Sequence, residues 1–223
     1  MKSVSVNPDD RAAALRLVKV SHETVVTLDQ FVELFLRWQK AVQLVATSTI
    51  SKLWTRHIAD SLQLIDLIPA EAKVVADLGS GGGFPGLILA IAFKEKSDAM
   101  VHLIESDSRK AAFLREVVRV TNAPAKVHAE RIESVAKRIA KPDVVTARAL
   151  APLPRLFDLA EPLMGAGTTG IFLKGQDVDR ELTEAAKSWN IRSKIVESRT
   201  DPSGKILLVQ GLARHPGKPS HEP

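Results

Sequence analysis

The chain has 223 residues, 45% of them hydrophobic and 26% charged, and its 31 basic and 26 acidic residues give a net charge of +5. A chain of this length suits one domain of about 150 residues plus an extension. The sequence contains no cysteine, which excludes disulfides, thiolate zinc sites and a cysteine nucleophile. It also lacks any run of about 18 apolar residues, so we expect no membrane span.

The first 70 residues carry patterns that are typical of helices. Apolar residues at helical spacing predict helices over 28–43 and 52–68, with Thr27 and Ser51 as the respective N-caps. A shorter helix is predicted over 9–20. Because no strand pattern interrupts this part, we expect a helical extension that packs against a larger unit.

From residue 73 onward, β-type runs alternate with helical segments. The runs cover residues 73–79, 100–106, 125–130, 142–147, 167–175, 194–200 and 205–213. This alternation predicts an α/β fold, with a mostly parallel seven-stranded sheet and helices on both faces. The last two runs follow each other closely, which predicts one antiparallel strand at the edge. We expect a helical extension over 1–70, an α/β domain over 71–212 and a disordered, proline-rich tail over 213–223.

A glycine-rich segment, DLGSGGGFPG over residues 77–86, follows the first strand and opens a helix. Glycines allow a tight turn and a close approach of the backbone to a ligand, and a helix N-terminus favours polar or anionic groups. Gly81, Gly83 and Gly86 also satisfy the dinucleotide fingerprint G-x-G-x-x-G. An NAD(P)-dependent oxidoreductase is therefore one alternative.

Asp77, directly before the first glycine, favours a different cofactor. Its carboxylate would repel a pyrophosphate but attract the cationic amino-acid part of S-adenosylmethionine, which carries no phosphate. Glu105 ends the second strand, where an acid accepts both ribose hydroxyls of either cofactor, so this residue does not discriminate. A non-catalytic RNA-binding protein with a degenerate pocket is the third hypothesis.

The sequence also limits which chemical groups could accept the methyl group. The donor is already activated and needs no metal, and the six histidines form no His-x-x-x-His pair. Methylation of pyrimidine carbon 5 requires a cysteine, and exocyclic amines are usually methylated beside an Asn/Asp-Pro-Pro-aromatic loop, where this chain has RALAPLP over 148–154. A ring nitrogen such as guanine N7 needs no general base. A sugar hydroxyl or a small-molecule acceptor stays open.

Several separated blocks resemble the bacterial RsmG family, also called glucose-inhibited division protein B, over about residues 25–210. The blocks are RWQKAVQLVA, LWTRHIADSLQL, VADLGSGGGFPGLILAI, LIESDSRKAAFLREVV, AERIE, TARALAPL and LKG. The resemblance implies a class I Rossmann-like methyltransferase fold and a cytoplasmic enzyme. It would use S-adenosylmethionine to methylate N7 of the guanine at position 527, in the 530 loop of 16S ribosomal RNA. The expected partner is this RNA or the small ribosomal subunit, free or still assembling, and we expect a monomer that does not bind membranes.

Carried over from the resemblance, cofactor contacts fall on Gly79, Phe84, Ile132, Glu133 and Arg148. With the residues argued from the pattern itself, the candidate cofactor-binding residues are Asp77, Gly79, Gly81, Gly83, Phe84, Glu105, Ile132, Glu133 and Arg148. Many family members have alanine or proline at the position of Gly82, a departure that should not remove binding. No metal site is expected.

The catalytic residues are not assigned by the sequence, and His57, Asp60 and Arg148 are the candidates. Arg56 and Asp60 have the spacing of an ordinary surface ion pair, which is the alternative interpretation of that block.

Several further basic residues have two interpretations. Arg109, Lys110, Arg115 and Arg119 lie along one predicted helix, either as a solvated face or as contacts for RNA phosphates. Lys174, at the end of the fifth strand, is a further candidate for RNA contact.

Overall fold

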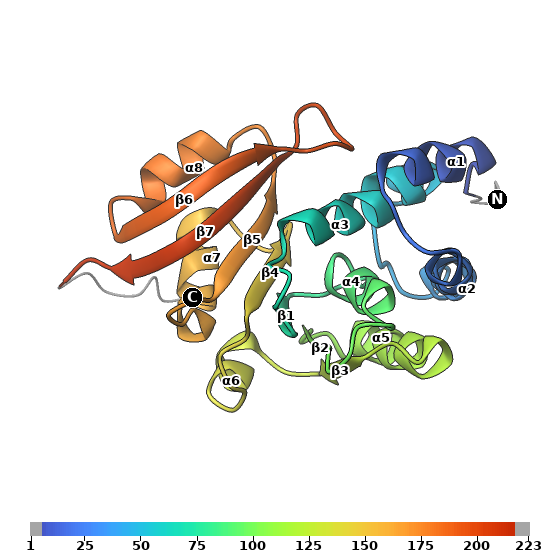
Figure 1. Cartoon of the computed structure of the whole chain (residues 1–223), viewed down its shortest axis with the longest axis horizontal. Coiled ribbons are helices and arrows are strands. Elements are labelled where there is room, and N and C mark those ends of the chain that lie inside the picture. Colours follow the sequence, from blue (N-terminus) through green and yellow to red (C-terminus); the bar gives the residue numbers. More distant parts are fainter. Residues whose placement is uncertain (1–5, 217–223) are drawn as a thin grey trace.

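A seven-stranded mixed sheet forms the centre of the computed structural model, which describes residues 6–216 (Figure 1). The strands are β1 (Val74–Leu78), β2 (Met100–Ile104), β3 (Ala125–His128), β4 (Val144–Arg148), β5 (Thr169–Lys174), β6 (Trp189–Glu197) and β7 (Lys205–Arg214). Their order is β3-β2-β1-β4-β5-β7-β6, and β7 is antiparallel to both of its neighbours. The predicted α/β fold with seven strands is confirmed.

The position of the antiparallel strand differs from the prediction. β7 pairs with β5 and leaves β6 at the edge. Ile206, Leu207 and Val209 of β7 are buried, whereas β6 is largely exposed along its length. The more apolar strand therefore takes the covered place inside the sheet, and the more polar one forms the edge.

The N-terminal helices are α1 (Pro8–Leu17) and α2 (His22–Gln39). The predicted cap of α2 is wrong: Ser21, not Thr27, caps this helix, because the Ser21 hydroxyl accepts the backbone N–H of Thr24 at 3.1 Å. Thr27 lies inside the helix, where its hydroxyl donates to the carbonyl of Glu23.

The next helical stretch is irregular and is built from η1 (Thr47–Lys52), η2 (Trp54–Ala59), α3 (Asp60–Leu62) and η3 (Gln63–Leu67). Ser51 lies inside η1, so the prediction that it caps a regular helix is wrong. The wide π-helical turn of η2 is anchored from α1, because the Asp10 carboxylate accepts the backbone N–H groups of Trp54 and Thr55. Such turns are rare and are often found at functional sites.

Helices cover both faces of the sheet (Figure 1). The remaining elements are α4 (Gly86–Ala92), α5 (Ser108–Thr121), α6 (Ile132–Ala136), α7 (Leu153–Ala160), η4 (Glu161–Leu163) and α8 (Val178–Ala185). The extension shares one hydrophobic core with α4 and α5, and α6, α7 and α8 share the other. This arrangement leaves the carboxyl ends of the parallel strands open at one edge, where ligands bind in sheets of this type.

The helical extension is tied closely to the rest of the molecule. Phe31 and Phe35 of α2 pack against Phe84 and Phe113, and the Trp38 indole donates to the Glu116 carboxylate of α5 at 2.8 Å. The domain boundary at residue 70 remains a prediction.

The predicted tail begins too early. β7 continues through Ala213 and Arg214, because their backbones pair with β6. Residues 217–223 lie outside the described part of the chain, so the prediction of a disordered tail cannot be followed there.

Candidate functional site

The turn that joins β1 to α4 requires glycine at several positions. Gly79, Gly81 and Gly83 have φ values of +67°, +53° and +92°, which L side chains rarely adopt. A Cβ at Gly79 would also come within 2.6 Å of the Leu150 side chain. Glycine at these positions therefore lets the turn follow this path without strain and brings bare backbone to the carboxyl edge of the sheet.

A cavity of about 620 Å³ lies along this turn, and we call it the first cavity. Its lining includes Leu44, Val45, Ala46, Thr49, His57, Gly79, Gly81, Phe84, Glu105, Lys110, Ile132, Glu133, Arg148, Ala149 and Leu150. Most of the predicted cofactor residues are brought together here. Among the described residues, Asp77 and Gly83 are the two candidates outside this lining.

Asp77 does not reach the first cavity as the sequence predicted. Its side chain is fully buried, and one carboxylate oxygen accepts the Thr146 hydroxyl at 2.8 Å. The other oxygen has no hydrogen-bond partner among the described residues, and a Cβ at Gly86 would lie only 2.6 Å from it. Burial raises the pKa of Asp77 to about 6. The carboxyl therefore lies beneath the turn at Gly86 and outside the lining of the first cavity.

Glu105 is a rigid part of the cavity wall. Its two carboxylate oxygens accept the backbone N–H groups of Gly81 and Asp107, each at 2.8 Å, and the residue is only 8% exposed. Each oxygen keeps further lone pairs, so the carboxylate can still accept hydroxyl groups of a ligand. Glu105 thereby links the glycine turn to the end of β2 in one fixed geometry.

Ile132 and Glu133 line the cavity from the start of α6. Ile132 is buried, whereas the Glu133 side chain is half exposed and pairs with Arg155 at 3.2 Å. An apolar wall beside an acceptor suits a heteroaromatic ring that carries an amino group.

One wall of the first cavity comes from the helical extension and was not predicted. The Gln39 side chain holds the segment Leu44–Ala46 in place: its oxygen accepts the N–H groups of Leu44 and Val45, and its nitrogen donates to the Val45 carbonyl. Phe84 extends this wall, with its ring 4.9 Å from that of His57. Gln39 forms these hydrogen bonds only with backbone groups, so the side chains of residues 44–46 give no indication of the contact in the sequence.

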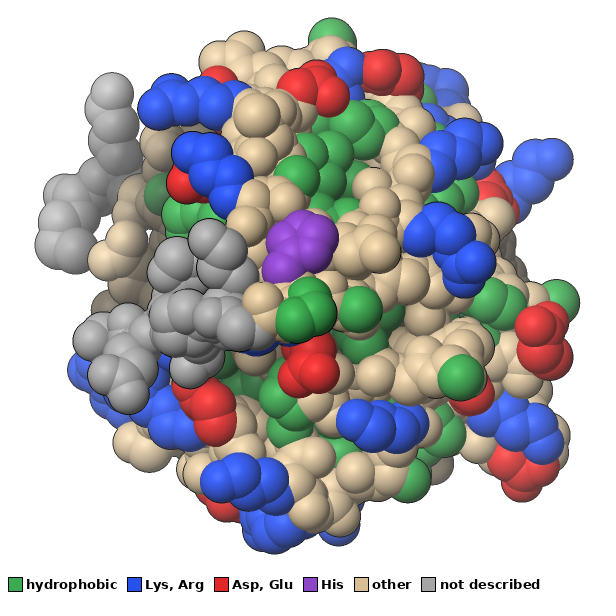
Figure 2. Space-filling model, turned by 90° about the vertical axis from the view of Figure 1, so that its left-hand side faces the viewer, with side chains coloured by type: hydrophobic (Ala, Val, Ile, Leu, Met, Phe, Trp, Pro, Cys, Tyr) green, Lys and Arg blue, Asp and Glu red, His purple; other side chains and the backbone are tan. Residues whose placement is uncertain are grey.

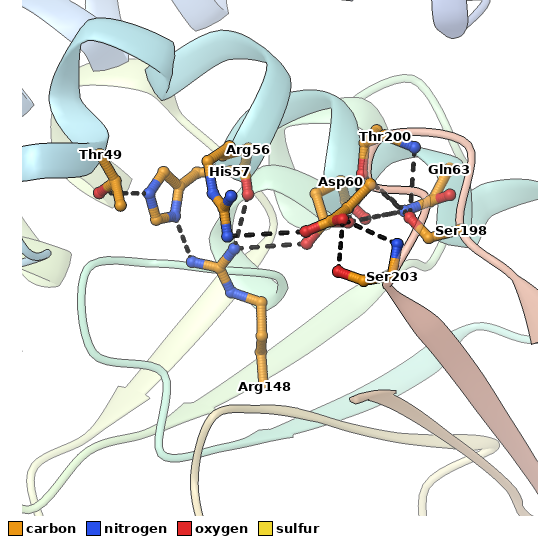
Figure 3. A network of polar contacts seen from close by, with 10 residues as sticks. Thr49, Arg56, His57, Asp60, Gln63, Arg148, Ser198, Thr200 and Ser203 are labelled. Carbon is orange, nitrogen blue, oxygen red and sulfur yellow. Dashed lines mark hydrogen bonds and ion pairs between the residues drawn. The ribbon is translucent and has the colours of Figure 1, made fainter. Parts of the chain in front are cut away.

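His57 and Arg148 both line the first cavity and contact each other there (Figure 3). Arg148 donates from Nη2 to His57 Nδ1, and His57 Nε2 lies 2.9 Å from the Thr49 hydroxyl. Since a guanidinium can only donate, Nδ1 is the acceptor and Nε2 carries the proton. Burial, with the positive charges of Arg148 and Arg56, lowers the pKa of His57 to about 3. The imidazole is therefore neutral, and both of its nitrogens are occupied.

Asp60 lies on the other side of Arg148. Its Oδ2 is 3.4 Å from Arg148 Nη1, which also donates to the Arg56 carbonyl in the π-helical turn. Oδ1 accepts the Thr200 hydroxyl at 2.6 Å and the Gln63 amide at 2.8 Å. Arg148 thus has a neutral imidazole on one side and a carboxylate on the other.

A second cavity of about 390 Å³ opens beside this group of residues. Its lining includes Thr49, Arg56, His57, Asp60, Arg148, Ala149, Lys174, Glu181, Ser198, Thr200, Asp201, Ser203 and Lys205. Thr49, His57, Arg148 and Ala149 border both cavities, so these residues form a shared wall.

The loop between β6 and β7 forms part of the wall of the second cavity and was not predicted from the sequence. Gln63, only 3% exposed, donates to Ser198 at 3.1 Å and accepts the backbone N–H of Arg199 at 2.8 Å. Together with the hydrogen bond from Thr200 to Asp60, these contacts join the helical extension to the C-terminal hairpin (Figure 3).

The predicted pairing of Arg56 with Asp60 is wrong. Arg56 instead lies 3.7 Å from Asp201, because the β6–β7 loop reaches this helix, and Asp60 faces Arg148.

The other basic candidates differ in their surroundings. Lys110 lines the first cavity, while Arg109, Arg115 and Arg119 are exposed. Lys174 is largely buried and pairs with Glu181 at 2.6 Å. On the face that carries β6, β7 and α8, Lys and Arg side chains are scattered among acidic and apolar ones and do not form one patch (Figure 2). The described side chains on that face therefore form no continuous track for a phosphate backbone.

Comparison with known families gives a match over most of the chain. A family model described as "GidB: rRNA small subunit methyltransferase G" matches residues 25–207. A Bradyrhizobium sp. (strain BTAi1) protein named ribosomal RNA small subunit methyltransferase G is 54% identical over 92% of this chain and 93% of its own length. A protein of the same name from Parvibaculum lavamentivorans is 49% identical over 91% and 90% of the two chains.

Solved structures with low sequence identity share the fold. A proposed O-methyltransferase from Klebsiella pneumoniae superposes with a TM-score of 0.59, at 13% identity, over 91% of this chain and 96% of that one. A mutant of MtNAS in complex with S-adenosylmethionine gives a TM-score of 0.54, at 14% identity, over 82% and 74% of the two chains. Within residues 6–216, every helix is too short or too polar to cross a membrane.

Proposed function

The chain belongs to the family of rRNA small subunit methyltransferase G, and from this premise we propose that its target atom is N7 of the guanine at position 527, in the 530 loop of 16S rRNA. The protein is an S-adenosylmethionine-dependent rRNA methyltransferase that acts on the RNA of the small ribosomal subunit. The observation that carries the proposal is that two cavities adjoin at His57 and Arg148, because in-line methyl transfer needs an acceptor site directly next to the donor site.

The residues of the first cavity fit the cofactor. Gly79 and Gly81 expose backbone where a side chain would intrude, which suits the amino-acid part. Glu105 would accept the ribose hydroxyls, and Ile132 and Glu133 would hold the adenine ring and its amino group. When bound there, S-adenosylmethionine supplies a methyl group on a positively charged sulfur.

The protonation state of the shared wall favours an acceptor that has no proton to lose. His57 is neutral, but its Nδ1 lone pair is taken by Arg148 and its Nε2 proton faces Thr49, so it is not free to act as a general base. Guanine N7 offers an available lone pair without deprotonation. The chain therefore contributes mainly by orienting the two partners and excluding water.

We also propose that the protein works as a monomer in the cytoplasm. Its substrate is either free 16S rRNA or a small subunit at some stage of assembly.

Incubation with labelled S-adenosylmethionine and small subunits that lack the modification tests the proposal. We expect one methyl group per particle, at N7 of a guanine in the 530 loop, detected by mass spectrometry and by chain cleavage at 7-methylguanosine. Transfer to another atom or another RNA region would refute the assignment.

A thermal shift experiment separates the two other hypotheses. We expect S-adenosylhomocysteine, at a hundredfold excess over Kd, to stabilise the protein by about 2.7 kcal/mol, and NAD to have no effect. Stabilisation by NAD alone would indicate an oxidoreductase. Binding of S-adenosylhomocysteine without any methyl transfer to RNA would indicate a protein that only binds.

A further inference from the structure

The second cavity has the position that the methyl acceptor needs. It shares Thr49, His57, Arg148 and Ala149 with the first cavity, so a base in the second cavity would lie next to a cofactor in the first. A base that reacts at a ring atom must leave its stack and enter such a pocket, where its edge is read by hydrogen bonds. This argument rests on the function proposed above.

Asp60 and Arg148 place a hydrogen-bond acceptor beside a donor on the wall of this cavity. Asp60 Oδ2 lies 3.4 Å from Arg148 Nη1, and their side chains are 15% and 18% exposed. Guanine presents the complementary pair on one edge, with O6 as an acceptor next to N1–H as a donor. Adenine presents the reverse, with its amino group as a donor next to N1 as an acceptor. The pair therefore matches guanine and opposes adenine.

The order of the two residues also fits the reaction. Asp60 borders only the second cavity, whereas Arg148 borders both. Along the guanine ring the order is N1, O6, N7. If N1 faces Asp60 and O6 faces Arg148, then N7 is the atom on the side of the first cavity. The same contacts that recognise the base would thus aim its reactive nitrogen at the cofactor.

The Asp60 carboxylate is held in a fixed orientation. Its Oδ1 is occupied by the Thr200 hydroxyl and the Gln63 amide, so that Oδ2 is the oxygen turned toward Arg148 (Figure 3). A carboxylate in this place also suits the charge of the product. During transfer the N7 lone pair forms the new bond to the methyl carbon, the electron pair of the carbon–sulfur bond stays on sulfur, and the positive charge passes into the purine.

We propose that the second cavity holds the target guanine, with Arg148 donating to O6 and Asp60 accepting from N1–H. Asp60 is then a residue that determines base specificity, and Gln63 and Thr200 are positioning residues that act through it.

The test compares Asp60→Asn with a matched control, Asp66→Asn. Asp66 follows on the same helical stretch and also pairs with an arginine, Arg199 at 2.6 Å, but it is exposed and borders neither cavity. Small subunits are reconstituted with guanine, inosine or adenine at the target position, and single-turnover methyl transfer is measured on each. The Kd for S-adenosylhomocysteine is measured for each variant.

For the unmodified protein we expect inosine, which keeps O6 and N1–H, to react within about tenfold of guanine, and adenine to react about 100-fold more slowly or worse. In Asp60→Asn the rate on guanine should fall about 100-fold, and the ratio of guanine to adenine should fall about tenfold, since an amide can donate to adenine N1. The Kd for S-adenosylhomocysteine should stay within about threefold. Asp66→Asn should match the unmodified protein throughout.

An unchanged ratio of guanine to adenine in Asp60→Asn would assign a purely structural role and overturn the proposal, as would inosine reacting as poorly as adenine. If Asp60→Asn is too slow to measure, Thr200→Val serves instead. It removes one of the two hydrogen bonds to Oδ1 but leaves Oδ2 in place. It should lower the same ratio by a smaller factor, whereas an unchanged ratio would overturn the proposal. Failure of the unmodified protein to methylate natural guanine would refute the proposed function itself, which is a separate outcome.

Discussion

The two cavities are built in different ways. The first is shaped by backbone: a glycine turn with three positive φ angles, fixed from one side by the Glu105 carboxylate. The second is shaped by side chains from two distant parts of the chain, the helical extension around Asp60 and Gln63 and the β6–β7 loop around Thr200. The backbone of the first cavity gives a rigid binding site for one cofactor. The side chains of the second cavity provide directional hydrogen-bonding groups that can select a base. We expect damage to either cavity to have separate consequences.

The largest expected effect concerns the backbone of the first cavity. Gly79→Ala places a Cβ at φ +67° and within 2.6 Å of Leu150, and we expect it to weaken binding of S-adenosylhomocysteine about 100-fold, measured by calorimetry. Gly167→Ala is the control. It imposes a similar backbone penalty at φ +97° with nothing within 4 Å, and it should leave the Kd unchanged. Equal loss in both variants would mean that the effect is general destabilisation.

Two glutamines provide a direct test of whether the two cavities have separate functions. Gln39 holds the wall of the first cavity, and Gln63 holds the loop that closes the second. Gln39→Ala and Gln63→Ala each remove hydrogen bonds that position a cavity wall. We expect each substitution to change one binding or kinetic parameter about tenfold. Gln39→Ala should raise the Kd for S-adenosylhomocysteine. Gln63→Ala should lower kcat/KM for the small subunit and leave that Kd unchanged. If both variants change the same parameter, the two cavities do not bind cofactor and RNA separately.

The buried Asp77 predicts a pH dependence of stability. Its pKa rises from 3.8 to about 6 on folding, so its contribution is fully present below pH 3.8 and is lost as the pH rises through 6. Between pH 5 and pH 6 this should cost the protein about 1 kcal/mol of unfolding free energy. In Asp77→Asn this pH-dependent loss of unfolding free energy should be missing. Urea unfolding curves of both proteins, recorded at each pH, measure the difference. Parallel pH dependence of the two proteins would contradict the burial argument.

The smallest expected effect concerns His57, whose titration should make no contribution to the pH dependence of kcat/KM. Because its pKa is held near 3, kcat/KM between pH 5 and pH 8 should contain no step from this imidazole. The profile of His57→Gln, measured on small subunits, should therefore have the same shape at a lower level. A step near pH 6.5 that disappears in the variant would show that His57 does titrate during turnover.

The first cavity was largely predictable from the sequence. The strand, glycines and helix are neighbours along the chain, so their spacing alone indicates the turn, and Glu105 follows from its place at the end of the next strand. The place of Asp77 was not predictable, because the sequence does not show that its carboxyl lies buried under Gly86, outside the lining of the first cavity.

The second cavity was not predictable in the same way. Gln63 and Thr200 carry no motif of their own, and their roles depend on contacts between residues 137 and 140 positions apart. The sequence placed Arg148 at the correct edge of the sheet, but its partners were set by the tertiary fold. Local patterns thus reveal a site made from one stretch of chain, and they miss a site assembled from several.

The most direct test of this division is a structure of the protein crystallised with S-adenosylhomocysteine. The account predicts the ligand in the first cavity, with its ribose at Glu105 and its adenine between Ile132 and Glu133, and the second cavity free of it. A ligand that lies instead between Asp60 and Lys174, in the second cavity, would contradict the account.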